Sequence, residues 1–494
     1  MIRGRVIGMK KIIILLTFIL FSTSSFAEQY PNSWKMNIQC KNGGDKWYEA
    51  HFVVDVIDDE FTLDLGSLVR WGWQKNIIFE GKINKNKVTI KQKFEWTGGG
   101  GLGRGIYKGK IKDNKAKLKG YNQWADSDPV SCNGEFLKVD SMPTFSPLEY
   151  LDQAIREVIE FTSYNPSYPM QIMNKSYLKI PVKISGELIL PPGGDNLPVV
   201  VVVHSSGGPS EFTDVSQWTW RNGFNNELLK NNIGIFQIDS FTGRGAKQTV
   251  DDQSKVVLHA GEMDALIAHK ILSEHPRIDG KRLGITGLSR GGMAATNVVE
   301  KRYSDAVLGP DSYFKASLPM AIDCWTNIFE NPMPTPTKTL WLLGADDDYT
   351  PPDLCISHVE KRKVQGADVE ILIKDGWVHD FYADTPIEIC KDCVIFNNEA
   401  CSAHLPKGLT YNDEGTPSKE VFKYFSKINN KSIEELMSIA TSEDTTWETA
   451  YQVFYDMYKA MYLDCATKGP KIGGDHAQET IDIAVPFFVN ALNG

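Results

Sequence analysis

The sequence lacks a long hydrophobic run in its body, an excess of basic charge and any internal repeat. Beyond residue 27 no stretch reaches about 18 consecutive apolar residues, so we expect no stable membrane span. The 494 residues carry 53 Lys and Arg against 62 Asp and Glu, a formal net charge of -9. Such a surface repels phosphate backbones, which argues against a nucleic-acid partner.

The first 27 residues differ from the rest of the chain. Basic residues precede an apolar run from Ile12 to Phe21, which is about half the length that spans a bilayer. Small residues in Ser25-Phe26-Ala27 then offer a cleavage point before Glu28. This pattern predicts a cleaved signal peptide over residues 1–27 and a periplasmic or secreted protein; an uncleaved anchor is the alternative.

Cysteine is scarce, but its number is even and all eight residues lie beyond the signal. An exported chain meets oxidising conditions, so structural disulfides are expected. Two pairs are predicted, Cys40 with Cys132 and Cys324 with Cys355. The other four cysteines are Cys390, Cys393, Cys401 and Cys465. They can form two disulfides in three different ways, and the sequence does not choose among these. A redox or zinc role for the C-x-x-C at Cys390 finds no support from a second such motif or a spaced His pair.

Residues 28–140 predict a small β-rich domain. Short alternating runs, at 50–56, 87–94 and 105–111, are separated by Gly, Asn and Asp. Six of the twelve tryptophans lie in this region. Trp71 and Trp73 would face the same side of a strand. They would form either a carbohydrate-stacking platform, which makes polysaccharide a candidate partner, or part of the domain core.

Residues 145–384 alternate strand-like apolar runs with amphipathic helix-like stretches, which predicts a mostly parallel α/β sheet. Eight strands are expected, at 158–161, 182–190, 198–204, 233–239, 282–287, 316–322, 339–343 and 369–374, with a helix over 254–275. Residues 385–474 read as an insertion with helices at 432–441 and 447–462, either a lid or a surface decoration. Residues 475–494 form the last helix of the domain.

Gly287-Leu288-Ser289-Arg290-Gly291 fits the G-x-S-x-G pattern. It follows a short buried strand and precedes an apolar helix start, the strand–turn–helix arrangement of a nucleophile elbow. The flanking glycines remove side chains that would collide in so sharp a turn. We therefore predict that Ser289 is a nucleophile.

A serine nucleophile needs a base, and the base needs an acid that holds its tautomer. His379, just beyond the last strand, is the predicted base, with His404 and His476 as rivals. The acid is expected among three adjacent aspartates after Gly344, and the spacing favours Asp347. Asp346 and Asp348 would alternatively cap the next helix. The three aspartates could also bind a metal ion, but the sequence shows no further cluster of ligands to complete such a site. Ser…Asp…His is the chain order of α/β-hydrolases.

The oxyanion hole requires two backbone N–H donors. Arg290, which follows the nucleophile, would supply one, and the loop after strand 198–204 would supply the other from Ser206 or Ser205, with Ser206 preferred. Asp239 and Arg244 are interpreted as a structural ion pair rather than substrate binders. Three tryptophans are expected in loops at the carboxyl end of the sheet, namely Trp218, Trp220 and Trp325. They would either line an apolar pocket or pack in the core.

Three motifs together resemble the dienelactone hydrolase-related family of α/β-hydrolases. They are the G-x-S-x-G at Ser289, residues 238–245 (Ile-Asp-Ser-Phe-Thr-Gly-Arg-Gly), and Gly344-x-x-Asp347-x-x-Thr350-Pro351. The resemblance covers residues 158–382 and the last helix, and it implies the α/β-hydrolase fold with a triad at Ser289, Asp347 and His379. Dienelactone hydrolases proper use cysteine as nucleophile, so the serine here favours a carboxylic-ester hydrolase.

The sequence thus predicts an exported serine esterase that acts on small-molecule or acylated esters, with no cofactor and no metal. Its fold is expected to be an α/β-hydrolase domain with an eight-stranded, mostly parallel sheet, preceded by the small all-β domain. Two alternatives remain: a serine peptidase on the same scaffold, and a non-catalytic protein that binds glycans or surfaces through the Trp-rich domain.

Overall fold

The computed structural model describes residues 33–493 apart from 43–44, 57–58, 65–73, 97–101, 125–126, 139–148, 213–217, 327 and 442–445. The chain divides into two compact units, residues 1–144 and residues 145–494. The predicted signal peptide and the pair Trp71 and Trp73 lie outside the described residues. No helix in the described part of the chain has the length and apolar character needed to cross a membrane.

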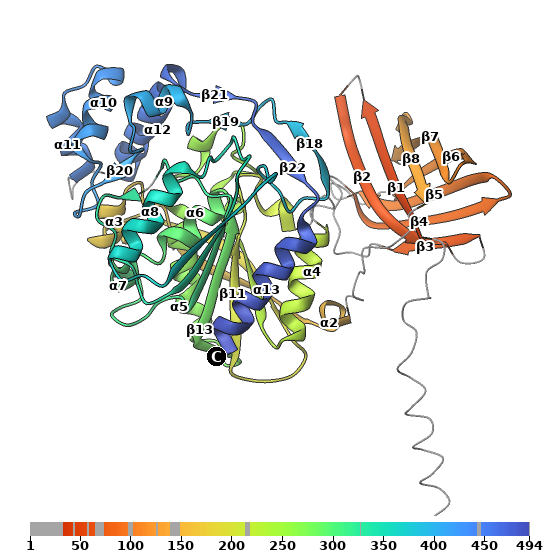
Figure 1. The fold of residues 1–494 in the computed structure, drawn as a ribbon, viewed down its shortest axis with the longest axis horizontal. Helices are drawn as coiled ribbons and strands as arrows, with labels where there is room; N and C mark the ends of the chain where they lie inside the picture. The colour runs from red at the N-terminus through yellow and green to blue at the C-terminus, as the bar shows by residue number, and fades with distance from the viewer. Residues whose placement is uncertain are drawn as a thin grey trace, which may run out of the picture. The chain divides into compact units, whose positions relative to one another are not determined.

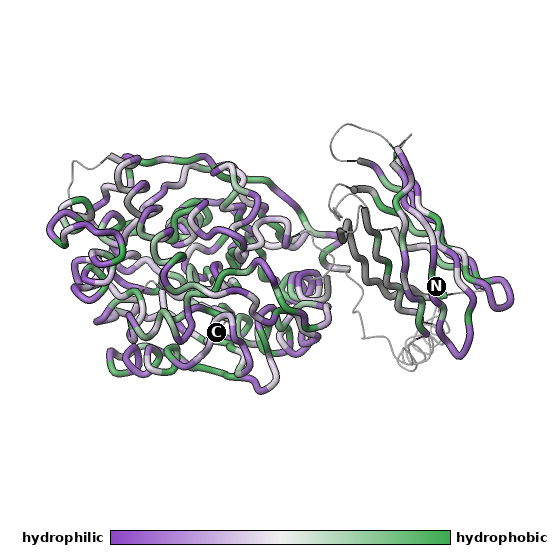
Figure 2. The backbone as a smooth tube through the Cα atoms, turned by 90° about the horizontal axis from the view of Figure 1, so that it is seen from above, coloured by the Kyte–Doolittle hydropathy of each residue, from purple (hydrophilic) through white to green (hydrophobic). Residues whose placement is uncertain are grey.

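The first unit is one antiparallel sheet of eight strands in the order β2-β1-β8-β7-β6-β5-β4-β3 (Figure 1). The strands are β1 (Ser33–Asn42), β2 (Asp45–Asp55), β3 (Glu60–Asp64), β4 (Gln74–Asn84), β5 (Lys87–Trp96), β6 (Leu102–Lys112), β7 (Lys115–Trp124) and β8 (Val130–Lys138). The hairpin turns at residues 84–87 and 112–115 are rich in Lys, Asn and Asp, and Figure 2 colours such turns as hydrophilic.

Alternation of buried side chains builds the core of this sheet. Met36, Ile38 and Cys40 are buried at every second position of β1, as expected for a strand with one covered face. Cys40 lies directly opposite Cys132 in the β1–β8 register, and the two form a disulfide. The predicted all-β domain and the predicted Cys40–Cys132 pair are therefore confirmed.

The second unit contains an eight-stranded sheet in the order β17-β16-β14-β13-β11-β12-β10-β9. Its strands are β9 (Ile155–Tyr164), β10 (Pro181–Leu190), β11 (Leu197–Val203), β12 (Gly234–Asp239), β13 (Ile278–Leu288), β14 (Ala316–Met320), β16 (Lys338–Gly344) and β17 (Val369–Lys374). From β12 to β17 neighbouring strands are parallel, whereas β10 pairs antiparallel with β9 and β12. All eight strands coincide with the predicted segments.

Helices cover both faces of this sheet. The apolar side chains of α4 (Trp218–Lys230) and α13 (Ala477–Asn493) form one core with the sheet, and α13 packs on α4 (Figure 1). On the other face α5 (Ala260–Ser273) and α6 (Arg290–Asn297) join a second core. The valine run of β11 is buried because it lies between these layers. The fold is the α/β-hydrolase fold preceded by an all-β domain, as predicted.

The expected helix over 254–275 begins only at Ala260. Residues 253–255 instead form the short 3₁₀ helix η5 (Gln253–Lys255), and the carbonyls of Val256 and Val257 accept hydrogen bonds from the Arg290 guanidinium. Carbonyls that point at a side chain from another element cannot also accept the hydrogen bonds of a helix. The predicted start of this helix at residue 254 is therefore wrong.

Residues 385–474 carry short strands and helices between β17 and α13. The strands are β18 (Thr385–Ile389), β19 (Val394–Ile395), β20 (Thr410–Tyr411), β21 (Thr467–Lys468) and β22 (Lys471–Gly474). The helices are α9 (Glu399–His404), α10 (Lys419–Asn429), α11 (Ile433–Thr441) and α12 (Trp447–Asp464), gathered together in Figure 1. The sequence predicted α11 and α12 but neither α9 nor α10.

Three disulfides belong to the second unit. Cys324 pairs with Cys355, as predicted, and Cys390 pairs with Cys393 within the C-x-x-C motif. Cys401 on α9 pairs with Cys465 at the end of α12. This arrangement is one of the three connectivities that the sequence left open, and no free cysteine remains in the described residues.

Candidate active site

Ser289 occupies a sharp turn between β13 and α6. Its backbone has φ 52° and ψ -116°, a conformation that L-residues with a side chain rarely adopt. The residue is partly exposed, although both neighbours Leu288 and Arg290 are buried. Strain of this kind persists only where the surroundings enforce it, and it concentrates at functional sites. The local geometry is that of the predicted elbow.

Glycine is required on both sides of this turn. A Cβ on Gly287 would lie 2.4 Å from the Gly291 carbonyl carbon, and a Cβ on Gly291 would lie 2.0 Å from the Val203 carbonyl oxygen. Both distances are far below van der Waals contact with backbone atoms that cannot move aside. The start of α6 can therefore approach the end of β11 closely only because these positions lack side chains.

His379 and Asp347 form a buried pair. His379 lies after β17 and Asp347 after β16, and the parallel pairing of these strands ends at Gly344 opposite Lys374. The Asp347 carboxylate contacts Nδ1 of His379 at 2.9 Å, and the two side chains are 1% and 3% exposed. This contact fixes the imidazole with its Nε2 edge free of Asp347, the orientation that a general base requires.

Three donors hold Asp347 in place. The backbone N–H groups of Tyr349 and Thr350 donate to Oδ1 at 2.9 and 2.8 Å, and the Thr350 hydroxyl lies 2.7 Å from Oδ2. The Tyr349 ring also packs against the His379 ring, with centroids 4.5 Å apart. Asp347 is thus an acceptor at the centre of a turn, which keeps its carboxylate aimed at the histidine.

The neighbouring aspartates have other contacts. Asp348 accepts the backbone N–H of Lys471, and neither Asp346 nor Asp348 caps α8 (Asp353–Val364), whose N-cap position is Pro352. Among the described residues, no group of three or more His, Cys, Asp and Glu side chains is arranged to hold a metal ion.

The rival histidines lie in other surroundings. His404 lies beside Asp464 and stacks on Tyr424 within the insertion. His476 stacks on Trp377 and lies near Asp475 and Glu479. The structure thus brings Asp347 together with His379 and with neither rival.

Burial and pairing act in opposite directions on the two titratable groups. Burial disfavours the imidazolium, but the charge and hydrogen bond of Asp347 outweigh it and raise the pKa of His379. Burial likewise opposes the Asp347 carboxylate, yet His379 and the Thr350 donors lower the pKa of Asp347. The pair therefore stabilises an ionised carboxylate beside a histidine that gains a proton readily.

Backbone hydrogen bonds connect Ser289 to this pair. The N–H of Ser289 donates to the carbonyl of Met320, and the carbonyl oxygen of the next residue, Ala321, lies 3.0 Å from the Thr350 hydroxyl oxygen. Thr350 in turn lies 3.2 Å from Nδ1 of His379. Ala321 has a left-handed backbone, φ 43°. The ends of β13, β14, β16 and β17 thus place the three predicted triad residues at one edge of the sheet.

The loop after β11 lies beside the elbow, because Val203 pairs with Gly287 in the β11–β13 register. Within this loop the backbone N–H of Ser205 donates to the Glu211 carboxylate at 2.9 Å, so it is occupied. The Ser206 carbonyl accepts the N–H of Thr249, and Glu211 contacts Ser205 rather than Ser206. Arg290 is the first residue of α6, where the N–H has no acceptor within the helix. Of the two predicted serines, Ser206 suits the donor role better.

His204 fixes the start of the same loop. Its Nδ1 lies 2.8 Å from the Ser205 carbonyl, and its Nε2 accepts the backbone N–H of Ser240. Burial lowers the pKa of His204 to about 4. The ring is therefore neutral and acts as a structural link between the loops after β11 and β12.

The expected ion pair between Asp239 and Arg244 is wrong. Arg244 makes a two-pronged contact with Asp264 on α5 at 2.7 and 2.8 Å, and the Asp264 side chain is fully buried. Asp239 instead accepts the backbone N–H groups of Phe241 and Thr242. A carboxylate two residues before a tight turn satisfies that turn locally, so the arginine reaches a more distant partner.

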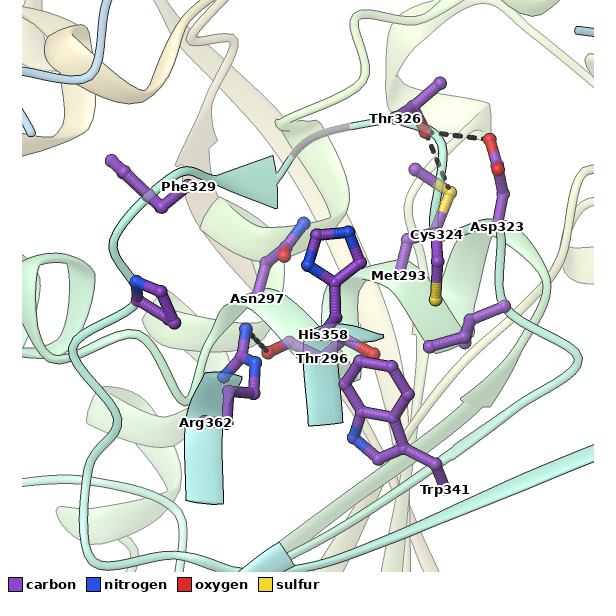
Figure 3. Close-up of a pocket in the computed structure, with 12 residues that line it drawn as sticks. Met293, Thr296, Asn297, Asp323, Cys324, Thr326, Phe329, Trp341, His358 and Arg362 are labelled. Carbon is purple, nitrogen blue, oxygen red and sulfur yellow. Dashed lines mark hydrogen bonds between the residues drawn. The ribbon is translucent and has the colours of Figure 1, made fainter. Parts of the chain in front are cut away.

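A small cavity of about 20 Å³ lies beside the site (Figure 3). Met293, one helical turn after Ser289, and Asp323, after β14, both line it, and the Thr326 hydroxyl donates to Asp323. Burial raises the pKa of Asp323 to about 6, and Asp347 and His379 lie within its electrostatic reach. The volume suits about one water molecule rather than a substrate group.

The tryptophans expected near the site belong to the core where they are described. Trp325 is fully buried, with its indole N–H on the Leu405 carbonyl, and Trp220 packs on Phe224 and Tyr382. The Trp218 side chain lies outside the described residues. The indoles of Trp220 and Trp325 do not line the cavity in Figure 3, whereas that of Trp341 does.

Comparisons with known proteins give matches by structure only. No protein-family model and no curated protein matches the sequence. Similar solved structures include a dienelactone hydrolase-like promiscuous phosphotriesterase from metagenomic libraries, which is 14% identical over 46% of this chain and 84% of that chain, with a TM-score of 0.34. A Pyrobaculum calidifontis esterase is 14% identical over 48% and 81%, with a TM-score of 0.32.

A third similar structure is a thermophilic esterase from the planctomycete Thermogutta terrifontis. It is 14% identical over 46% of this chain and 84% of that chain, with a TM-score of 0.31. At these identities the resemblance concerns the fold alone.

Four residues around the site were not anticipated as part of it: Gln253, Asp323, Tyr349 and Thr350. Thr350 stands in the Gly344-x-x-Asp347-x-x-Thr350 motif, so its spacing from the acid was a usable signal. Gln253 lies in the segment that was expected to be helical, and no local pattern marks it.

Proposed function

We propose that this protein is an exported serine hydrolase that cleaves carboxylic esters with Ser289, His379 and Asp347. The observation that carries the proposal is the buried Asp347–His379 contact at 2.9 Å, which follows β16 and β17, in the same parallel sheet whose strand β13 leads into the strained turn at Ser289. A histidine held by a buried carboxylate and a serine in an enforced left-handed turn are both costly arrangements that packing alone does not require.

The proposed reaction has two stages. Ser289 Oγ attacks the ester carbonyl carbon while Nε2 of His379 accepts its proton, and the N–H groups of Ser206 and Arg290 stabilise the oxyanion. The intermediate collapses as His379 delivers that proton to the leaving alcohol, which leaves an acyl-serine. Water then attacks the acyl carbon with His379 again as base, releasing the acid and restoring the serine. Asp347 stays ionised throughout and stabilises the imidazolium.

Export is part of the proposal. Its support is the basic and apolar pattern of residues 1–27 together with four disulfides, which persist in oxidising compartments. Treating the purified protein with a thiol reductant and following its unfolding would test the dependence on disulfides. Fractionation of expressing cells would test the location, and a protein retained in the cytoplasm with its first residues intact would contradict it.

The decisive experiment replaces the nucleophile. Ser289→Ala should abolish hydrolysis of short p-nitrophenyl esters while the far-ultraviolet circular dichroism and the melting temperature stay close to those of the native chain. A fluorophosphonate probe should label the native protein and not the variant. Undiminished turnover in Ser289→Ala would place the chemistry elsewhere. Matched ester and peptide-amide substrates distinguish an esterase from a peptidase on this scaffold.

A further inference from the structure

One side chain, Gln253, joins the two loops that supply the proposed oxyanion donors. Its Nε2 donates to the Ser206 hydroxyl at 2.9 Å, and its Oε1 accepts from the Arg290 guanidinium at 3.0 Å. The Thr249 hydroxyl also donates to Oε1, while the Thr249 N–H donates to the Ser206 carbonyl. The residues whose backbone N–H groups must converge on one oxygen are thus tied to the same amide.

Gln253 also reaches the histidine side of the site. Burial raises the pKa of Tyr349 and the Gln253 side chain opposes that rise, while the Tyr349 ring packs on His379. The backbone carbonyl of Gln253 accepts a second contact from the Arg290 guanidinium at 3.3 Å. Arg290 is buried and also bonds the carbonyl of Val257. A guanidinium with several fixed acceptors holds the helix start on which it stands.

The inserted segment holds Gln253 from outside. The N–H of Gln253 donates to the Tyr458 hydroxyl at 3.0 Å, and Lys459 contacts the Asp252 carboxylate at 2.6 Å. Tyr458 and Lys459 are consecutive residues of α12, so the two contacts attach one helix to two consecutive residues of the segment around η5. Tyr458 is buried, and its ring packs against Phe396 of the same insertion.

We propose that Gln253 is a positioning residue of the oxyanion hole and that α12 of the insertion keeps it in place through Tyr458. This inference rests on the proposed function, because it assigns a role within the same site. The insertion is then neither a mobile cover nor a surface decoration. It is a fixed support, and the oxyanion donors depend on it for their spacing.

The physical reason is the sensitivity of an oxyanion hole to distance. Its donors act on charge that develops only in the transition state, so a loss of alignment lowers kcat while ground-state binding changes little. Removing one donor outright costs roughly 10²- to 10³-fold in kcat. If two donors are misaligned but neither is removed, kcat should fall less, by about 10- to 100-fold.

The test compares Gln253→Met with Gln253→Glu in the full chain, using p-nitrophenyl acetate. Methionine keeps the length and removes the hydrogen bonds, so we expect kcat to fall about 10- to 100-fold with KM within about two-fold. Glutamate keeps an acceptor for Arg290 and the hydroxyls, and we expect it to retain most of the activity. The burst of p-nitrophenol should keep its amplitude in both, which separates slower chemistry from a smaller folded fraction.

Tyr458→Phe tests the support from α12, and Tyr462→Phe, one turn later on the same helix, is the matched control. We expect about a 3- to 10-fold loss of kcat in the first and none in the second, with equal melting temperatures. Unchanged kcat in Gln253→Met, or a loss that appears wholly in KM, would overturn the positioning role. Equal kcat in the two tyrosine variants would overturn the role of α12. Failure of the proposed function is a separate outcome, since native protein would then be inactive and unlabelled by fluorophosphonate.

Discussion

The Asp347 carboxylate and Nδ1 of His379 are 2.9 Å apart, although 32 residues separate them in the sequence. Two adjacent parallel strands bring them together, and two backbone N–H groups and a threonine hydroxyl also hold the carboxylate. The contact therefore depends on the sheet and on the turn after β16. It has consequences that can be measured.

The first prediction concerns pH. A general base must be neutral, and Asp347 raises the pKa of His379 from its ordinary value of 6.5. The value of kcat/KM should therefore rise with pH with a midpoint above 6.5. In Asp347→Asn burial still lowers the pKa of His379, and only the weaker charges of Asp380 and Asp348 oppose it, so that pKa falls and the midpoint moves to lower pH, while kcat drops about 10⁴-fold. A pH–rate profile of both proteins checks this; a midpoint that moves upward in the variant would refute the pairing.

The second prediction concerns the glycine after the elbow. Gly291→Ala places a methyl group 2.0 Å from the Val203 carbonyl oxygen, so we expect a loss of about 3 kcal/mol in the free energy of unfolding and loss of activity. Gly193→Ala is the control, since a Cβ there meets no atom within 4 Å. Urea denaturation of both variants measures the difference. Equal stability of the two would contradict the close approach of α6 to β11.

The third prediction separates strain from chemistry at Ser289. Alanine keeps the unfavourable left-handed backbone of this position, whereas glycine adopts it without steric cost. Ser289→Gly should therefore unfold with a free energy about 1 kcal/mol higher than Ser289→Ala, and both should be inactive. Thermal denaturation followed by circular dichroism provides the measurement. A less stable glycine variant would mean that the turn is not strained in solution.

The fourth prediction concerns the partner of Arg244. Asp264→Asn leaves a buried guanidinium without its counter-charge, and we expect a loss of about 3–5 kcal/mol in the free energy of unfolding. Asp239→Asn keeps an oxygen that can accept from Phe241 and Thr242, so a change of no more than about 1 kcal/mol is expected. Chemical denaturation distinguishes them. If Asp239→Asn is the more damaging, the assignment of the ion pair is wrong.

Much of the fold could be predicted because burial leaves a clear pattern. The valines of β11 are apolar at successive positions since both faces of that strand are covered, and the G-x-S-x-G turn needs its glycines for steric reasons. Long-range polar contacts left no such pattern. Arg244 bonds Asp264 rather than the nearer Asp239, and the start of α5 moves to Ala260 because Arg290 takes carbonyls of the preceding segment.

The candidate site shows the same division. Ser289, Asp347 and His379 follow strands and could be chosen from their positions, and they remain predictions for which activity measurements are needed. Gln253 and Tyr458 could not be chosen, because their contact joins segments 205 residues apart. The sequence preferred Ser206 to Ser205 without a physical reason, and the contact between Ser205 and Glu211 supplies one.

The insertion begins and ends at one place. β18 pairs antiparallel with β22, and β19 pairs with β21, so the outgoing and returning chains run together. On its return, Gly473 donates to the His379 carbonyl. Both ends of the insertion are therefore anchored beside His379, and side chains from its interior, including Val421, Phe422 and Met461, belong to the same hydrophobic core as β11 and α5. Shortening the insertion would therefore expose part of this core as well as remove the chain that contacts His379.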